Sequence, residues 1–464
     1  MTHPSERVLA TLNVDGSRRW LRPNLSEGSF WHQRRVVAYG LMLVFFIIPY
    51  LRLNDKPLIL LDLPRREFTI FGTTFLPTDT LLFMLLFVIV GISIFLATAL
   101  FGRVWCGWGC PQTVYLEFLF RPFERLIEGG RTGTLALDRQ PGLKPRRVLK
   151  WAVYLLLALF LAHTFLAYFV GIEQLARWVR LSPAEHPTAF LLMAGTTAAI
   201  MFNFTYFREQ TCLVACPYGR LQSVLLDRQS LIVGYDVKRG EPRGKVTKEA
   251  AGARGDCIDC GACVMTCPTG IDIRDGLQME CIHCTQCADA CDDIMDRVGK
   301  PRGLVRYTSR DEIDGEPRRL LPPRVILYPA ALTVAVVAFL YFLGNRHDTD
   351  ITILRGIGAP FVIDAEGRVV NQIRVRLTNR GRETRSYRIE MVGGAGADLI
   401  SPENPVPVTP GERRSTGLFI VGPRTMFHDG ELGISLRISD GGGYEETLPY
   451  TLIGPETKEE EDDR

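Results

Sequence analysis

The chain has almost no net charge, no cysteine after residue 291, and no apolar stretch near its N-terminus. Its 54 Lys and Arg nearly balance 51 Asp and Glu, and the formal net charge of +3 argues against nucleic-acid binding. Residues 1–35 are charged and lack an apolar core, so we predict no cleavable signal peptide. Residues 351–455 contain no cysteine, which excludes a stabilising disulfide in that part of the chain.

Apolar residues are abundant and concentrated in blocks. About 20 apolar residues cross the hydrocarbon core of a bilayer, and four of the five blocks reach that length. The first block is shorter and contains Pro49, so it would need arginines that reach the interface at its ends. We therefore predict about five transmembrane helices, at residues 36–51, 80–101, 151–172, 188–207 and 325–344.

The distribution of Lys and Arg predicts the sidedness of these helices. Residues 1–35 carry six of these residues and the loop 102–148 carries eight, against four in 52–79 and two in 173–187. The positive-inside rule then places the N-terminus, the second loop and the long segment 208–324 in the cytoplasm. The part of the chain that follows the fifth helix is predicted to be periplasmic.

Two cysteine runs near the middle of the chain share the spacing C-x2-C-x2-C-x3-C, and Pro268 follows the first. This spacing is the bacterial ferredoxin signature for two [4Fe–4S] clusters, in which the fourth cysteine of each run binds the other cluster. We therefore assign one cluster to Cys257, Cys260, Cys263 and Cys291, and the other cluster to Cys281, Cys284, Cys287 and Cys267.

Zinc and disulfides are the competing interpretations of these runs. Four C-x-x-C pairs can hold two zinc ions, but zinc ribbons rarely carry a third cysteine at the same short spacing. A disulfide framework is disfavoured because cytoplasmic thiols stay reduced. The second run departs from the pattern, since Asp292 and not Pro follows Cys291, and the stretch 268–280 between the runs is short. Neither departure removes a ligand.

A different motif, C-x3-C-P, occurs twice with an offset of 106 residues, once after the second predicted span and once after the fourth. Internal repeats of this kind bring equivalent sites together, so we expect four thiols to converge at the bilayer surface. Thiolates are soft ligands, which makes copper the favoured occupant. A further iron–sulfur cluster, a redox dithiol and four inert buried cysteines remain open. The residues concerned are Cys106, Cys110, Cys212 and Cys216.

The order of these motifs resembles that of the CcoG family, the cytochrome c oxidase accessory proteins also called FixG or RdxA. The resemblance covers nearly the whole chain and rests on Cys-Gly-Trp-Gly-Cys-Pro-Gln-Thr, Cys-Leu-Val-Ala-Cys-Pro-Tyr-Gly-Arg and the two ferredoxin runs. It implies a protein of the bacterial inner membrane that reduces Cu(II) to Cu(I) for assembly of cbb3-type oxidase. The C-x3-C-P halves are also similar to membrane polyferredoxins of the NapH type.

The C-terminal part alternates apolar and polar residues in short runs such as 372–378 and 433–438, with turn signals between them. This pattern predicts an immunoglobulin-like all-β sandwich. The whole is a multi-domain integral membrane protein. Its predicted parts are an N-terminal segment (1–35), a four-helix membrane region (36–207), a cytoplasmic segment with a ferredoxin-like domain at about 250–300 (208–324), a fifth helix (325–344), a periplasmic β domain (345–457) and a charged tail (458–464).

Two histidines and two tryptophans also invite interpretation. His163 lies inside the third predicted span, where a polar side chain can mark a site, but the predicted spans contain no second histidine, which argues against a bis-His haem. His283 lies within the second ferredoxin run, whose four-cysteine set is already complete. We interpret Trp105 and Trp108 as interfacial anchors of a helix end.

The predicted activity is that of a cupric reductase. Electrons from a cytoplasmic reductant or a membrane quinol would reach two clusters and pass to copper near the four membrane cysteines. The alternatives are a quinol-linked conduit to a partner reductase and a non-catalytic assembly scaffold. Oxidase assembly factors or copper chaperones are the expected partners. The sequence leaves the electron donor, the oligomeric state and the role of the β domain open.

Overall fold

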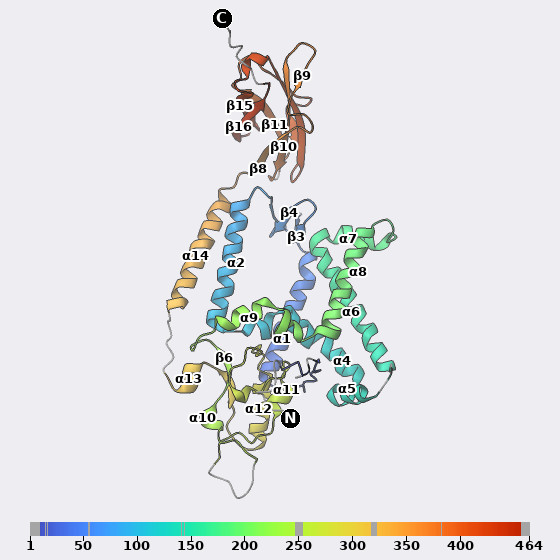
Figure 1. Ribbon diagram of the computed structural model, residues 1–464, viewed down its shortest axis with the longest axis vertical. Coiled ribbons are helices and arrows are strands. Elements are labelled where there is room, and N and C mark those ends of the chain that lie inside the picture. The colour runs from blue at the N-terminus through green and yellow to red at the C-terminus, as the bar shows by residue number, and fades with distance from the viewer. Residues whose placement is uncertain are drawn as a thin grey trace. The chain divides into compact units, whose positions relative to one another are not determined.

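The computed structural model describes residues 10–13, 15, 17–53, 56–140, 142, 144–245, 254–316, 323–381 and 383–455. The predicted charged tail at 458–464 lies outside these residues, as does part of the N-terminal segment. The chain forms two compact units, Met1–Phe339 and Leu340–Arg464. The membrane helices and the ferredoxin runs therefore share the first unit, and the β domain occupies the second (Figure 1).

Four helices of the described residues are long and apolar enough to cross a membrane. Only 6% of the apolar window is buried in α2 and in α14, which leaves surfaces suited to lipid. These two helices lie side by side, with the rings of Phe95 and Tyr328 6.5 Å apart (Figure 1). The four helices are α2 (Thr80–Phe101), α6 (Pro145–Val170), α8 (Pro187–Phe202, extended to Phe207 by a π-helical turn) and α14 (Pro323–Gly344).

Helix α6 begins six residues before the predicted span because Pro145 sets a helix start and the basic residues that follow tolerate the helical conformation. Helix α1 (Ser29–Ile47) also starts early, and so incorporates Arg34, whose side chain is buried. Because its first turns are polar and charged, α1 is not among the helices apolar enough to count as a membrane span, and a crossing at 36–51 stays a prediction.

The connection between α1 and α2 contains short strands that the sequence patterns did not indicate. β3, β4 and β5 form an antiparallel meander, and β1 pairs with β2. Their bounds are β1 (Arg52–Leu53), β2 (Lys56–Pro57), β3 (Ile59–Asp62), β4 (Glu67–Ile70) and β5 (Thr73–Phe75). The remaining helices near the membrane region are α3 (Pro111–Tyr115), α4 (Arg121–Glu128), α5 (Gly130–Arg139), α7 (Ile172–Arg180) and α9 (Pro217–Val224).

The ferredoxin segment is small and rich in loops. Antiparallel strands β6 (Ile232–Tyr235) and β7 (Val305–Thr308) bring its two ends together. Its helices are α10 (Val237–Gly240), α11 (Ala262–Thr266), α12 (Gln286–Arg297) and α13 (Arg310–Asp314). Several of the cysteines belong to the buried core of the segment, so the cofactor sites make up much of its interior.

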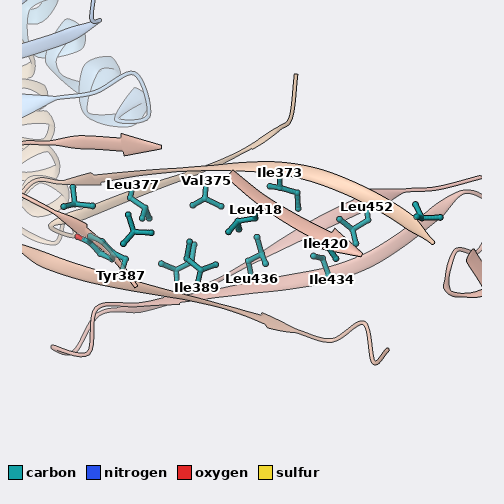
Figure 2. Close-up of a cluster of buried hydrophobic side chains, with 14 of the residues drawn as sticks. Ile373, Val375, Leu377, Tyr387, Ile389, Leu418, Ile420, Ile434, Leu436 and Leu452 are labelled. Carbon is teal, nitrogen blue, oxygen red and sulfur yellow. The ribbon is translucent and has the colours of Figure 1, made fainter. Parts of the chain in front are cut away.

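The second unit is a β-sandwich, as the alternation predicted. One sheet has the order β12-β14-β10-β8, with β9 beside β10, and the other has the order β13-β11-β15-β16. Ile373, Val375 and Leu377 of β10 share one face because they alternate, and they pack with Ile389 and Leu436 of the opposite sheet (Figure 2). The strands are β8 (Thr349–Arg355), β9 (Val362–Ile363), β10 (Val369–Asn379), β11 (Arg385–Val392), β12 (Asp398–Ile400), β13 (Val406–Val408), β14 (Arg413–Gly422), β15 (Glu431–Ser439) and β16 (Glu445–Ile453).

Candidate functional site

The eight cysteines of the ferredoxin runs border two cavities. The fourth cysteine of each run lies with the first three of the other run, which is the arrangement that the predicted crossover requires. One cavity is bordered by Cys257, Cys260, Cys263 and Cys291, and the other by Cys281, Cys284, Cys287 and Cys267. Cys263 also reaches the second cavity, so the two sites are neighbours.

The two runs wrap their cavities with the same backbone. In the first run Asp259 and Gly261 have φ of +54° and +67°, and in the second His283 and Thr285 have φ of +54° and +58°. A helix starts at the next residue in each case, α11 and α12 respectively. Non-glycine residues rarely adopt this conformation, and such strain concentrates at functional sites. The two loops that carry the cysteines therefore share one backbone shape.

The donor set fits iron–sulfur clusters better than zinc. All twelve cysteines are free thiols. Each cavity is bordered by the first three cysteines of one run and by the fourth cysteine of the other run, which is the ligand arrangement of a two-cluster ferredoxin and not that of a zinc ribbon. Burial raises the pKa of Cys263, Cys281 and Cys291 to about 12, so without a bound metal these groups stay protonated at neutral pH.

The two C-x3-C-P motifs also share one backbone. Each occupies a π-helical turn, Trp105–Gly109 and Thr211–Ala215, closed in both cases by a 2.8 Å hydrogen bond from the amide of the second cysteine. Each turn is preceded by a residue with positive φ, Gly102 at +57° and Arg208 at +49°. The proline that follows each motif starts the next helix, α3 or α9. The sequence repeat is therefore a structural repeat.

The repeat brings the four membrane cysteines close to one another. Cys106 and Cys212 pack in the same apolar cluster. Burial, together with the charges that Cys110, Cys106 and Cys216 would carry, raises the pKa of Cys212 to about 12. A hydrogen bond joins the two halves of the repeat, because the side-chain amide of Gln112 donates to the carbonyl of Arg208 at 2.9 Å. The repeat thus brings Cys106 of the first motif and Cys212 of the second into one cluster.

This group of thiols lies directly against the second ferredoxin run. Cys106, Ile282 and Cys284 form one buried cluster. Gly107 faces the backbone of residues 282–284 with no room for a side chain. The buried Arg34 donates to the carbonyl of Gly107 at 2.9 Å and so fixes the turn from the side of α1. Of the two ferredoxin sites, the one formed by the second run is therefore the nearer to the membrane cysteines.

Comparisons with known proteins match three parts of the chain. Residues 80–128 match a 4Fe-4S binding domain, residues 207–310 a 4Fe-4S dicluster domain, and residues 339–455 the IG-like fold at the C-terminus of FixG. Protein RdxA of Cereibacter sphaeroides is 34% identical over 87% of this chain and 89% of its own length. The nitrogen fixation protein FixG of Rhizobium meliloti is 31% identical, over 92% of this chain and 91% of its own.

The chain belongs to the FixG/RdxA family. Protein RdxB of Cereibacter sphaeroides, 35% identical over 88% of both chains, supports the same assignment. With its iron–sulfur domains and four membrane-compatible helices, the protein is a membrane iron–sulfur electron-transfer protein.

The sequence did not predict the hydrogen bonds that hold the ferredoxin segment of this FixG/RdxA-family protein against the first membrane motif. The amide of Arg103 donates to Nδ1 of His283 at 3.2 Å, and Tyr307 donates to the carbonyl of His283 at 2.9 Å. Trp108 in turn donates from Nε1 to the Tyr307 hydroxyl at 2.9 Å. Trp108 therefore joins two segments, which the predicted role of interfacial anchor did not include. Burial lowers the pKa of His283 to about 3, so the ring is neutral.

A network of buried charges follows the first motif, and it was also missed. Glu117, Arg121, Glu124 and Glu128 are spaced three or four residues apart, which is the signal that could have revealed one charged helical face. Arg208 donates to both oxygens of Glu124, at 3.0 and 2.9 Å. Burial opposes ionisation of Glu124, but Arg208 outweighs it and lowers the pKa of that carboxyl. Buried ions are costly, so such a network points to function more than to stability.

His163 has no part in these sites. Its Nδ1 atom lies 2.8 Å from the carbonyl oxygen of Leu159, one turn earlier in α6. The histidine is thus satisfied within its own helix, in line with the absence of a second histidine in the spans.

Proposed function

We propose that the protein reduces Cu(II) to Cu(I) at Cys106, Cys110, Cys212 and Cys216, for assembly of a cbb3-type oxidase. The observation that carries the proposal is the packing of Cys106 against Cys284. A group of four soft ligands thus lies against a residue assigned to an electron carrier. Such ligands select Cu(I) over harder ions.

When bound, the two [4Fe–4S] clusters supply one-electron transfer, which matches a metal that changes its charge by one. The residues that we assign to them are Cys257, Cys260, Cys263 and Cys291 for one cluster and Cys281, Cys284, Cys287 and Cys267 for the other. The surroundings of the four membrane thiols have separate roles. Ile282 and Tyr218 pack around Cys106 and keep water away. Gln222 accepts a hydrogen bond from the Cys106 thiol at 3.1 Å and orients it.

The Cys106 thiol holds its proton until copper arrives. Burial raises the pKa of Cys106 to about 11. Copper binding as thiolate must therefore release protons, and binding should weaken as the pH falls. In the product state, Cu(I) is retained by the same sulfur atoms until a partner accepts it.

The proposed location is the bacterial inner membrane, with the ferredoxin segment on the cytoplasmic side and the β domain in the periplasm. Copper chaperones or oxidase assembly factors are the proposed partners. A homo-oligomer is compatible with this plan. The β domain would meet such partners on the periplasmic side.

A second function is favoured by one observation. The 4Fe-4S binding domain matched at 80–128 contains Cys106 and Cys110. If the four membrane thiols hold a further cluster, the protein is an electron conduit to a partner reductase. The iron content separates the two functions, because a third [4Fe–4S] cluster raises the iron per chain from about eight to about twelve.

The test is made anaerobically on detergent-purified protein. The clusters are reduced, excess reductant is removed, and Cu(II) is added with a Cu(I)-specific chelator. Recovery of the oxidised cluster absorbance, matched by stoichiometric Cu(I), is the expected result. The double variant Cys106→Ser/Cys110→Ser should bind less copper while its cluster absorbance is unchanged. If the clusters stay reduced and the copper stays cupric, the proposal is wrong.

A further inference from the structure

A cavity of about 540 Å³ lies at one end of the helices α6 and α8, apart from the cysteine sites. Lys150 and Trp151 near the start of α6 border it, as do Thr205 and Tyr206 at the end of α8. Both helices are long and apolar enough to cross a membrane. Because residues near an end of each helix border one cavity, the cavity lies where the spans meet the polar boundary of the bilayer. Its volume is typical of a binding site for one small ligand.

One part of the cavity wall is aromatic. The rings of Trp20 and Tyr206 meet edge to face at 5.9 Å. Trp20, Trp151 and Tyr206 are 43%, 45% and 50% exposed, so the chain itself leaves much of their surface uncovered. Aromatic side chains of this kind are enriched at membrane interfaces, where the ring contacts acyl chains and its polar atom contacts head groups.

The rest of the wall is basic. Among the described residues, four cations border the cavity and one carboxylate does. The cations are Arg22, Arg147, Lys150 and Arg208, and the carboxylate is Asp138. Basic pockets between membrane helices, at the end that meets the cytoplasm, bind the phosphates of lipid head groups.

Two of the four cations are matched by carboxylates behind the cavity wall. Lys150 pairs with Glu128 at 2.6 Å, and Arg208 pairs with Glu124 at 2.9 Å. Both cations are largely buried. They belong to the buried ionic network and so add little free charge for a ligand.

The other two cations, Arg22 and Arg147, share one carboxylate. Both pair with Asp138, Arg22 at a distance of 3.2 Å. Arg22 also lies 3.8 Å from Glu124, but that carboxylate already accepts two hydrogen bonds from Arg208. The side chain of Arg147 is 26% exposed, more than that of any other cation bordering the cavity. One positive charge is therefore left over at the part of the cavity that a ligand can reach.

We propose that the cavity binds an anionic phospholipid, with its phosphate held by Arg22 and Arg147 and its acyl chains along α6 and α8. A phosphodiester carries one negative charge, which matches the charge that Asp138 leaves over. The planar guanidinium group of arginine binds phosphate oxygens through two parallel hydrogen bonds. This inference goes beyond the proposed function, since it requires neither copper nor a cluster.

Two other ligands fit the cavity less well. A soluble phosphate compound has no apolar part to cover the half-exposed rings of Trp20, Trp151 and Tyr206. A zwitterionic lipid covers the rings, but it brings a cation of its own into a pocket that already has a positive charge in excess. An anionic lipid satisfies the aromatic wall and the basic wall together.

The test uses full-length protein in detergent, with dioctanoyl phosphatidylglycerol as the probe in isothermal titration calorimetry. Two comparison ligands separate the contributions: dioctanoyl phosphatidylcholine has the same chains without net charge, and glycerol 3-phosphate has a phosphate without chains. We expect phosphatidylglycerol to bind about ten-fold more tightly than either, which is the effect of one charge-assisted hydrogen bond.

Two variants should change the affinity for phosphatidylglycerol in opposite directions. Arg147→Gln should bind it about ten-fold more weakly. Asp138→Asn should bind it more tightly, because both arginines lose the carboxylate that they share. The matched control is Arg146→Gln, which removes the same charge one residue earlier in α6, from an exposed side chain that does not border the cavity. Cluster absorbance equal to that of the unaltered chain shows that each variant folds.

Equal affinity of Arg147→Gln and Arg146→Gln for phosphatidylglycerol would overturn the proposal, as would weaker binding by Asp138→Asn. Phosphatidylcholine bound as tightly as phosphatidylglycerol would identify a lipid surface without selectivity for charge. Glycerol 3-phosphate bound as tightly would identify a site for a soluble phosphate compound. Either of these last two results would also overturn the proposal.

Discussion

A Cβ atom added to Gly107 would lie 2.9 Å from the Cα atom of Cys284. The first membrane motif and the second ferredoxin run therefore meet backbone to backbone. This contact connects segments almost 180 residues apart, and it defines which of the two ferredoxin sites is near the membrane thiols.

The substitution Gly107→Ala should push the first membrane motif and the second ferredoxin run apart. The added methyl group also meets the carbonyl oxygens of Ile282 and His283, at 2.7 and 2.8 Å, and rigid backbone cannot yield cheaply. We expect a loss of about 1–3 kcal/mol in stability, together with reduced iron in the purified protein, measured by thermal unfolding and iron analysis. Gly91→Ala is the control, since nothing lies within 4 Å of its added Cβ. Equal behaviour of the two variants would contradict the contact.

Cys267→Ser and Cys291→Ser should each remove one cluster but have different consequences. Cys267 lies with the second run, next to the membrane thiols, and Cys291 lies with the exposed Cys260. Each variant should keep about half of the iron, or about four atoms per chain. After reduction with dithionite, Cys291→Ser should still reduce one Cu(II), and Cys267→Ser none. Identical copper reduction in both variants would argue against a proximal and a distal site.

Arg208→Met should be strongly destabilising because it leaves Glu124 buried without its main partner. Breaking one partner of a buried ion pair typically costs about 3–5 kcal/mol. The control is Arg297→Met, whose partner Asp293 is four residues earlier on α12 and whose side chain is 69% exposed. That surface pair should contribute less than about 1 kcal/mol. Unfolding temperatures measured side by side check this, and equal values for the two variants would show that Glu124 does not depend on Arg208 in the folded chain.

The stability of the protein should fall in acid, and Glu117 should contribute to the decrease. Burial opposes ionisation of Glu117, but Arg121 and Arg125 outweigh it and hold its pKa at about 2, below the ordinary 4.5. Its contribution is therefore complete above pH 4.5 and is lost as the pH falls toward 2. Unfolding temperatures measured from pH 6 to pH 3 should fall less steeply in Glu117→Gln than in the unaltered chain. Parallel curves would show that Glu117 has no such effect.

Much of the architecture could be predicted because it depends on local sequence. The span 80–101 coincides with α2, since an uncharged block of this length has few other structures open to it. Alternation predicted the sandwich for a similar reason, because residues two apart share a face. The IG-like domain, the iron–sulfur domains and the family were confirmed by the comparisons.

What could not be predicted depends on contacts between distant residues. The bond from Trp108 to Tyr307 joins positions 199 apart, and each residue alone has a commoner explanation. Lys150 precedes the predicted span 151–172, but α6 starts at Pro145 and so includes Lys150, which pairs with Glu128. The copper occupant of the membrane thiols stays a prediction, because sulfur ligands alone do not distinguish copper from a further cluster.

Gly102 and Arg208 occupy equivalent positions in the repeat, but only Gly102 lacks a side chain. A Cβ at Gly102 would come within 2.0 Å of the carbonyl oxygen of Leu231, so the ferredoxin segment docks where a side chain is missing. At the equivalent position in the other half, Arg208 has a side chain, and that side chain donates to Glu124. The two halves of the repeat therefore differ at the position where the ferredoxin segment packs against Gly102. The symmetry of the repeat ends at this position, and the two halves share one ferredoxin segment instead of having one each.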